Sequence, residues 1–400
     1  MKALIYRYGS ICEPDIIDGF KELGIDVFEI DIEIHDKTVL PKQTVEIVSK
    51  YLQDNPVDFV FSINFYPALS EVCNIYHIRY FSWTVDSPVL EIFTKSISNE
   101  WNRTFLFDRA QYNELIGYNP DRIFHLPLAA NPEKMRSRIE KTTGKAFGIA
   151  TSCSNRFSHD VAFVGSLYSE KCPYDEIKGL TEYARGFLQG IINAQKNVYG
   201  YYFVDEVLPD IIIEEIKAHV PNFDKLKDYD NYITDIIIAS QFYIASKITT
   251  TERQELFKRI SEKLDTHIYT ASSTEMMPKI HNHGTCSTLT EMPVIFNSSK
   301  ININTTSKAI RSGIPLRVFD ILSCGGFVIS NFQPELAEFF TPGQDVILYS
   351  SIDECVDLCR YYLENEAERR SIAEAGYETL CKFHTYKIRL AQMITTGFEI

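Results

Sequence analysis

Short apolar runs alternate with amphipathic segments through the first third of the chain. Apolar, β-branched and aromatic residues favour strands at positions 3–8, 27–34, 57–65, 78–85, 104–108 and 123–126. Segments between them, such as 14–23, 44–52 and 109–117, have the residue spacing of helices. Strands that alternate with helices at short intervals require right-handed crossovers and form a parallel sheet. We therefore predict that residues 1–145 form a doubly wound, Rossmann-like α/β domain.

Residues 131–159 interrupt the alternation. They contain several Lys and Arg residues and then a Ser/Thr-rich piece, and we predict that they form a linker. The alternation of strands and helices returns after them. A strand is expected at 161–166, followed by a mostly helical section over about 174–264. Later strands are predicted at 267–270, 294–296, 300–304, 327–330 and 345–349, with helices at 318–323, 352–363 and 366–383. We assign residues 146–385 to a second Rossmann-like domain with a helical insertion. Residues 386–400 are predicted to form a C-terminal helix that crosses back to the first domain.

Size and charge limit the classes of protein to consider. A chain of 400 residues exceeds one ordinary core, which agrees with two domains. The formal net charge of −14 argues against nucleic acid as a partner, because binding phosphates along a strand needs a basic face. Nine scattered cysteines without a Cys-x-x-Cys pair are typical of a reducing compartment. Because we find neither a signal peptide nor an apolar run long enough to span a bilayer, we expect a cytoplasmic protein without a transmembrane segment.

Residues 299–327 carry the clearest functional signal, since they read as a strand, a polar loop, a short helix and a second strand. A helix N-terminus with nearby glycines binds anions, and we expect a nucleotide diphosphate. Asp320 lies in an otherwise apolar helix and is predicted to accept hydrogen bonds from ribose hydroxyls; the alternative is a surface acid. Arg317, Lys300 and, more weakly, Arg311 are candidates to neutralise the diphosphate, although Lys300 also suits a solvated position at a strand start.

Polar residues at strand ends extend this hypothesis. Asn304 ends the strand at 300–304 and is a candidate for donor contact, with turn capping as the alternative. Gly165 and Ser166 end the strand at 161–166. Their backbone is predicted to approach a phosphate or a sugar, and a plain tight turn is the competing interpretation.

Several motifs resemble the GT-B glycosyltransferases. Ser-Lys-Ile-x-Ile-Asn at 299–304 and Gly-Ile-Pro-Leu-Arg-Val-Phe-Asp-Ile-Leu-x-Cys-Gly-Gly-Phe at 313–327 are similar to the group-1-type C-terminal domain of that group. The more specific likeness is to its spore-maturation (CgeB-like) family, to which segments 83–88, 126–132, 160–168 and 384–389 add weaker support. The resemblance covers nearly the whole chain. It implies a GT-B fold, in which two Rossmann-like domains face a central cleft.

The resemblance also implies an activity and roles for named residues. A hexosyl or N-acetylhexosaminyl group would pass from a nucleotide-sugar donor, UDP-linked, to a glycan or protein acceptor without a metal or other cofactor. The nucleobase would lie near Tyr269 and Thr270, which end a predicted strand; Tyr269 could stack on it, but a core position is the simpler interpretation of this tyrosine. Retaining relatives use two glutamates that contact the donor sugar and the ribose; the first position is Ser312 here and the second is Asp320. We therefore expect ribose binding to be kept and the sugar contact to differ.

Two further groups are candidates for catalysis or metal binding. Asp86 follows the strand at 78–85. In an inverting reaction it is our candidate for the base that takes the proton from an acceptor hydroxyl. In a retaining reaction it would position the acceptor, and the competing interpretation is a residue that caps the turn before Pro88. His281 and His283 lack further ligands at a familiar spacing. We therefore predict no metal site and place both histidines in a loop over the cleft.

Two alternatives to transfer remain open at this point. The first is a GT-B hydrolase or epimerase of nucleotide sugars, which would need no acceptor site. The second is a non-catalytic nucleotide-sugar-binding protein, to which the serine at position 312 gives some support.

Overall fold

The computed structural model describes residues 1–149 and 158–400, which divide into two compact units. Unit 1 consists of Met1–Ala129, Asp224–Ile233 and Thr385–Ile400, and unit 2 consists of Ala130–Phe223 and Thr234–His384. The Ser/Thr-rich part of the predicted linker, 150–157, lies outside the described residues. Each unit is built around one parallel sheet, as the alternating pattern predicted.

The sheet of unit 1 has the strand order β2-β1-β3-β4-β5-β6, and all its pairings are parallel. Its central strand β3 is buried at every position, which explains why the sequence reads as a continuous apolar run there. The strands are β1 (Lys2–Tyr6), β2 (Asp26–Ile30), β3 (Phe59–Ile63), β4 (Arg79–Trp83), β5 (Asn102–Leu106) and β6 (Ile123–His125).

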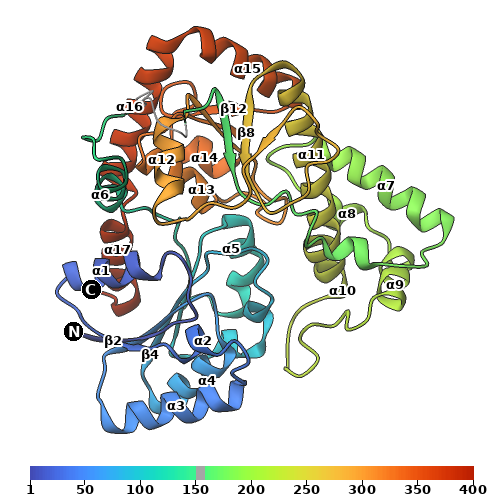
Figure 1. The fold of residues 1–400 in the computed structure, drawn as a ribbon. Helices are drawn as coiled ribbons and strands as arrows, with labels where there is room; N and C mark the ends of the chain where they lie inside the picture. The colour runs from blue at the N-terminus through green and yellow to red at the C-terminus, as the bar shows by residue number, and fades with distance from the viewer. Residues whose placement is uncertain (150–157) are drawn as a thin grey trace. The chain divides into compact units, whose positions relative to one another are not determined.

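Helices cover both faces of this sheet (Figure 1). Helix α17 runs against α1, where a Cβ atom at Gly19 would come within 2.6 Å of Leu390, and one at Gly397 would come within 2.2 Å of the Phe81 ring. The two glycines therefore permit the close packing that places the C-terminal helix in unit 1. The helices are α1 (Glu13–Glu22), α2 (Ile32–His35), α3 (Pro41–Asp54), α4 (Pro67–Tyr76), η1 (Leu90–Phe93), η2 (Lys95–Ser98), α5 (Arg109–Leu115), η3 (Ile116–Tyr118) and α17 (Tyr386–Phe398).

The sheet of unit 2 has the order β12-β11-β10-β7-β8-β9 and is also parallel. Its core contains Val161, Ile268, Ile303 and Ile329, packed against apolar residues of the covering helices. The strands are β7 (Val161–Val164), β8 (Thr266–Tyr269), β9 (His281–Asn282), β10 (Ile301–Asn304), β11 (Val328–Asn331) and β12 (Ile347–Tyr349).

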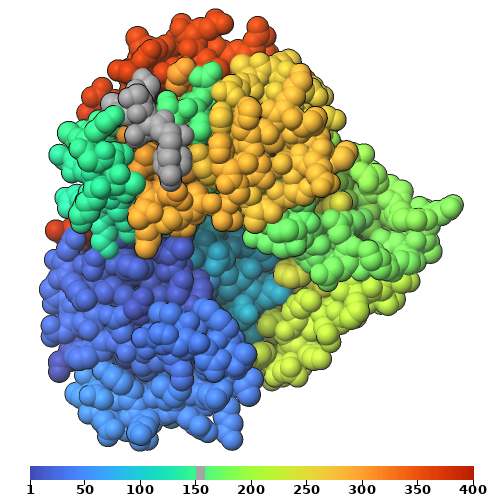
Figure 2. Space-filling view, viewed as in Figure 1, coloured from blue at the N-terminus to red at the C-terminus, as the bar shows by residue number. Residues whose placement is uncertain are grey.

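The helical section expected after β7 is present, and helices α7 to α9 form a projecting part of unit 2 (green in Figure 2). The helices of this section are η4 (Pro173–Glu176), α7 (Glu182–Lys196), α8 (Val204–Val207), α9 (Asp210–His219), α10 (Asp235–Ile237), a π-helical segment η5 (Ile238–Ile244) and α11 (Ala245–Lys263). The remaining helices of unit 2 are α6 (Pro132–Thr143), α12 (Glu291–Ser298), α13 (Leu316–Ser323), α14 (Pro334–Phe339), α15 (Ile352–Glu364) and α16 (Glu366–Phe383). No helix among the described residues is both long and apolar enough to cross a membrane.

Three predicted elements are wrong. The proposed linker contains helix α6, which begins where the Asn131 side chain accepts a hydrogen bond from the Lys134 backbone and ends at Gly144 in the left-handed conformation. The predicted strand at 294–296 belongs to helix α12, whose side chains are buried all round and show no helical periodicity. The predicted strand at 27–34 ends at Ile30, because its last residues form the short helix α2.

Residues 224–233, the connector loop, join α9 to α10 but pack within unit 1. Lys95 donates a backbone hydrogen bond of 2.8 Å to Asp230, and Asn231 forms a β-bridge with Thr94. The ring of Tyr232 stacks on Tyr118 with centroids 4.2 Å apart. The connector loop is therefore fixed to unit 1 by backbone and aromatic contacts together.

Candidate functional site

The loops at the carboxyl edge of the unit 2 sheet are tied together by Arg253, a buried residue of α11. Its Nη1 donates a 2.5 Å hydrogen bond to the Ser166 carbonyl after β7, and its Nη2 donates a 2.5 Å bond to the Thr305 carbonyl after β10. Its guanidinium group also lies 4.7 Å from the Tyr168 ring centre. One planar guanidinium group thus fixes two strand-end loops. A lysine ammonium in its place would orient the two carbonyl groups less strictly, because its donors are not held in a plane.

Glu170 joins the loops after β7 and β8. Its two carboxylate oxygens accept hydrogen bonds from Ser166, at 2.6 Å, and from Ser272, at 2.5 Å. Burial alone would raise the pKa of Glu170, but these hydrogen bonds lower it below its ordinary value. Glu170 is therefore a charged anchor that brings the loop carrying Thr270 to the loop carrying Gly165.

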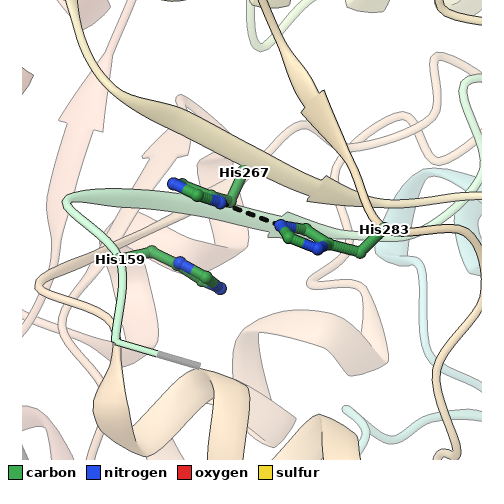
Figure 3. A group of neighbouring side chains, drawn as sticks. All are labelled: His159, His267 and His283. Carbon is green, nitrogen blue, oxygen red and sulfur yellow. Dashed lines mark hydrogen bonds between the residues drawn. The ribbon is translucent and has the colours of Figure 1, made fainter. Parts of the chain in front are cut away.

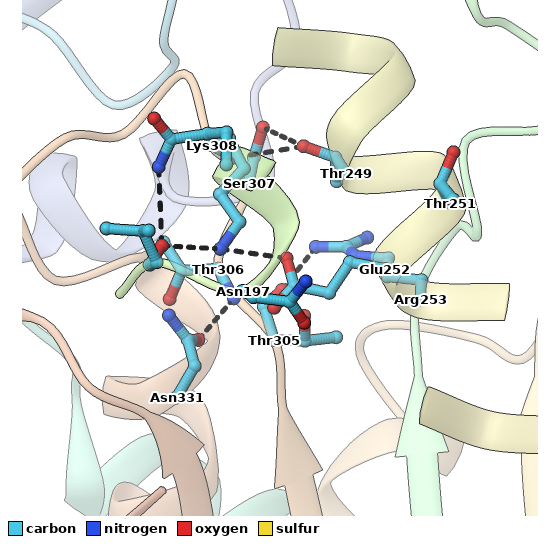
Figure 4. Close-up of polar contacts among 12 residues, drawn as sticks. Asn197, Thr249, Thr251, Glu252, Arg253, Thr305, Thr306, Ser307, Lys308 and Asn331 are labelled. Atoms are coloured by element: carbon cyan, nitrogen blue, oxygen red, sulfur yellow. Dashed lines mark hydrogen bonds and ion pairs between the residues drawn. The ribbon is translucent and has the colours of Figure 1, made fainter. Parts of the chain in front are cut away.

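A buried ion pair fixes the loop between β10 and α13 (Figure 4). Nζ of Lys308 lies 3.1 Å from a carboxylate oxygen of Glu252, and both side chains are at least nine-tenths buried. The Lys308 backbone donates to the Thr249 hydroxyl at 2.9 Å, and the Thr306 backbone donates to Asn331 at 2.6 Å. These contacts position the main chain of 305–308 at the end of β10.

Helix α13 carries the predicted ribose ligand and phosphate ligand. Asp320 is 5% exposed, and Arg317 Nη1 lies 3.4 Å from its Oδ2. Arg317 is half-buried and extends over the Phe296 ring at 5.3 Å. The acid and the guanidinium are therefore neighbours on the first two turns of one helix. The glycine pair after it serves packing, because a Cβ at Gly326 would lie 2.7 Å from the Phe296 carbonyl.

The structure brings most of the predicted donor residues to one edge of the sheet. Gly165, Ser166, Thr270 and Asn304 lie at carboxyl ends of strands or just after them, and Arg311 follows in the loop after β10, 3.8 Å from Asp205. Asn304 is buried, and its amide donates to Thr306 and Ser330. It therefore shapes the loop from inside.

Two predicted residues are placed elsewhere. Lys300 precedes β10 at the amino edge of the sheet, where its Nζ lies 2.6 Å from Asp160. The Tyr269 side chain turns to the sheet face, with its hydroxyl 2.7 Å from Nε2 of His159 and its ring stacked on His283 at 4.7 Å. Neither side chain joins the loops after β7 and β10.

Ser312, which the resemblance placed at the first glutamate position, is hydrogen-bonded to a carboxylate. Its hydroxyl donates to Oε1 of Glu335 at 2.8 Å, and Glu335, at the start of α14, is 1% exposed. A carboxyl group is therefore present one hydrogen bond from this position, and it belongs to helix α14.

Unit 1 has a pocket of about 430 Å³ that contains Asp86. Oδ2 of Asp86 accepts a 2.8 Å hydrogen bond from the Asn64 amide and lies 3.5 Å from the Tyr8 hydroxyl. Tyr8, Asn64 and Asp86 follow β1, β3 and β4, so they share the carboxyl edge of this sheet. Aromatic and acidic side chains line the pocket: Tyr8, Phe65, Tyr66, Tyr229, Glu33, Asp86 and Glu91.

The charge of this pocket restricts what it can bind. No Lys or Arg is found among its described lining residues, whereas three carboxylates are. Aromatic faces and hydrogen-bond acceptors suit a saccharide, which presents both C–H faces and hydroxyl donors. The three carboxylates disfavour a phosphorylated ligand, and the nearby Lys37 ammonium donates to the Tyr8 carbonyl and lies 5.7 Å from the centre of its ring.

Sequence reasoning missed Arg253, Lys308, Glu170 and Glu335. A weak signal was available for the first, because Glu252 and Arg253 lie beside the apolar positions Leu256 and Ile260 of the same helix. Charged residues on the buried side of an amphipathic pattern indicate partners elsewhere in the fold. The other three gave no such signal. Lys308 and Glu335 have partners distant in the chain, and Glu170 joins its neighbour Ser166 to the distant Ser272.

Comparisons with known proteins agree on the fold. Residues 252–395 match the family model described as glycosyl transferase-like. A glycosyltransferase from Rickettsia africae is 13% identical, with a TM-score of 0.53 over 100% of this chain and 98% of that one. Anabaena HepE in complex with UDP and glucose is 11% identical, with a TM-score of 0.52 and full coverage of both chains. Sucrose-phosphate synthase from Thermosynechococcus elongatus is 9% identical, with a TM-score of 0.55 over 100% of this chain and 99% of that one.

These structures confirm the predicted GT-B fold class, with a six-stranded parallel sheet in each unit. No curated protein matches the chain.

Proposed function

We propose that this protein is a glycosyltransferase that moves a sugar from a nucleotide-sugar donor to a saccharide hydroxyl. The observation that carries the proposal is the carboxyl edge of unit 2, where Arg317 and Asp320 lie on one short helix within the residues that match the glycosyl transferase-like family. The structure of HepE in complex with UDP and glucose supports UDP as the nucleotide and a hexose as the sugar. The motifs at 299–304 and 313–327 support the narrower assignment to the spore-maturation group.

On the donor side, Asp320 accepts hydrogen bonds from ribose, and Arg317 with main-chain N–H groups of the strand-end loops stabilises the diphosphate. As the bond between the sugar and the diphosphate oxygen breaks, negative charge collects on the departing UDP, and these fixed donors stabilise it without a metal ion. Adding or omitting Mg²⁺ is accordingly expected to leave the initial rate of transfer unchanged.

On the acceptor side, we assign the unit 1 pocket. Asp86 takes the proton of the acceptor hydroxyl as that oxygen forms the new bond to the sugar. The three carboxylates favour a neutral or cationic saccharide over a phosphorylated one.

Turnover assays separate this function from the alternatives. UDP-glucose and UDP-N-acetylglucosamine should be consumed with release of UDP only when a neutral oligosaccharide is added. Loss of donor without acceptor would instead indicate a hydrolase or an epimerase. Binding of UDP without turnover across a panel of acceptors would indicate a non-catalytic protein.

Removing the Asp320 carboxylate tests the donor assignment. Asp320→Ala should weaken UDP binding by about 1–3 kcal/mol, the cost of losing a charged hydrogen-bond partner in a buried position. Calorimetric titration with UDP measures this. Glu374→Ala, at an exposed position of α16 in the same unit, is the control and should bind UDP as the unmodified protein does. An unchanged affinity in a folded Asp320→Ala protein would remove Asp320 from the site.

Tyr229, contributed by the connector loop, tests the acceptor pocket. Tyr229→Ala should raise the KM for the acceptor several-fold, because an aromatic contact contributes about 0.5–1.5 kcal/mol beyond area burial. The Kd for UDP should not change. Tyr183→Ala removes an exposed tyrosine of unit 2 and serves as the matched control. If both variants have the KM of the unmodified protein, the acceptor does not contact Tyr229.

A further inference from the structure

Four histidines from three segments meet on one face of the unit 2 sheet. His159 precedes β7, His267 lies in β8, and His281 and His283 belong to β9 and the residue after it. His267 pairs with His281 in the parallel register, so their side chains share a face. Figure 3 shows His159, His267 and His283 with their rings side by side.

Hydrogen bonds orient the ring of His267. Its Nε2 lies 3.1 Å from Oδ2 of Asp265, and its Nδ1 lies 2.8 Å from Nε2 of His283. When Nε2–H donates to the carboxylate, the lone pair of Nδ1 points toward His283. A carboxylate that fixes a histidine tautomer in this way is the usual partner of a metal-binding imidazole.

The ring of His159 completes the group from the buried side. The side chain is 5% exposed, and its Nε2 contacts the Tyr269 hydroxyl at 2.7 Å. Its Nδ1 is buried and has no hydrogen-bond partner within the described part of the chain. A buried nitrogen without a partner is costly and points to a missing ligand.

We propose that His159, His267 and His283 bind a divalent transition-metal ion of the zinc type, with Asp265 as the positioning residue. One nitrogen from each histidine lies within 4.8 Å of the others. In a tetrahedral zinc site with bonds of about 2.0 Å, the nitrogen ligands lie roughly 3.3 Å from one another. The three histidine nitrogens therefore need only small shifts to reach the spacing of zinc ligands. His159 now stacks on His267 at 3.8 Å, and its ring must turn to direct a lone pair at the ion. A water molecule would take the fourth position on the exposed side of His283.

The position of the site indicates what the ion would do. Tyr269 and His283 flank the segment that contains Thr270 and Ser272, and Ser272 is bonded to Glu170. A bound ion would fix both ends of this segment and so order one loop of the donor edge. The proposal concerns binding and local order. It stands whether or not the chain transfers a sugar.

Titration of the reduced, EDTA-treated protein with ZnCl₂ tests the proposal. One equivalent should bind, and zinc should raise the melting temperature. His283→Ala should abolish both effects, and since His283 is exposed, this variant should fold. His35→Ala, an exposed histidine of unit 1, should bind zinc normally. Equal zinc binding by the unmodified protein and His283→Ala, or no binding by either, would overturn the proposal.

The role of Asp265 gives a second, graded test. Asp265→Asn should weaken zinc affinity by about 10- to 100-fold, the usual effect of removing such a partner. Cobalt substitution distinguishes the ligand type, because imidazole ligation lacks the thiolate-to-metal charge-transfer absorption that cysteine ligands give. Strong charge-transfer absorption that persists in His283→Ala would assign the ion to cysteines and contradict the site.

Discussion

Asp86→Asn is expected to lower kcat by about 10²- to 10⁴-fold, the usual contribution of a general base, and to leave the Kd for UDP unchanged. Asparagine has nearly the shape of aspartate and can keep a hydrogen bond with Asn64, but it cannot accept the proton of the acceptor hydroxyl. The loss should therefore appear in the chemical step. The carboxylate is exposed in the pocket, so the substitution should not unfold unit 1.

Steady-state release of UDP with a neutral oligosaccharide acceptor measures the effect, and calorimetry measures the Kd for UDP. Asp54→Asn, an exposed position at the end of α3 outside the pocket, is the matched control and should retain full turnover. A fall in UDP affinity would show that Asp86 contacts the donor. An unchanged kcat would assign the proton transfer to another group.

The fold was predictable where burial leaves a simple trace in the sequence. Parallel strands covered on both faces read as apolar runs, and β3 was found this way, with two extra residues predicted at each end. Strand β10 alternates Ile and Asn and was found at nearly its observed bounds. Helix α12 defeated the same reasoning, since every residue after Glu291 is buried and an apolar run of that length fits a strand as well. Helix α6 was missed for a different reason. Its charged residues suggested a linker, although Asn131, Pro132 and Gly144 are cap signals that were available.

The site was predictable only where its parts are close in the chain. Arg317 and Asp320 are one helical turn apart, so their shared position followed from the sequence. Arg253 contacts carbonyl groups 87 and 52 residues away, and such partners follow only from the fold. The histidine group shows the same limit. His281 and His283 gave no metal prediction on their own, because His159 and His267 join them through the pairing of β7, β8 and β9.

Lys308→Met is expected to destabilise unit 2 by about 3–5 kcal/mol, because it leaves Glu252 buried without its counter-charge. Glu252 is 1% exposed, and its carboxylate lies 3.1 Å from the Lys308 ammonium, with the Tyr199 side chain as a further neighbour. The same change frees the loop at 305–308, so UDP affinity should fall as well. Replacing both residues, as in Glu252→Met with Lys308→Met, should recover much of the stability, because buried pairs are often replaced by apolar residues at little cost.

The two tryptophans allow the transition of unit 2 to be isolated. Trp83 and Trp101 both lie in unit 1, so tryptophan fluorescence follows that unit, whereas circular dichroism follows both. In urea, Lys308→Met should shift the dichroism transition to lower concentration and leave the fluorescence transition in place. Lys217→Met breaks the more exposed pair with Asp235, at 2.6 Å, and should cost about 0–1 kcal/mol. If the two variants lose the same small amount, the Glu252–Lys308 pair does not stabilise the loop, and the ordering of the donor edge must rest on Arg253 and Glu170.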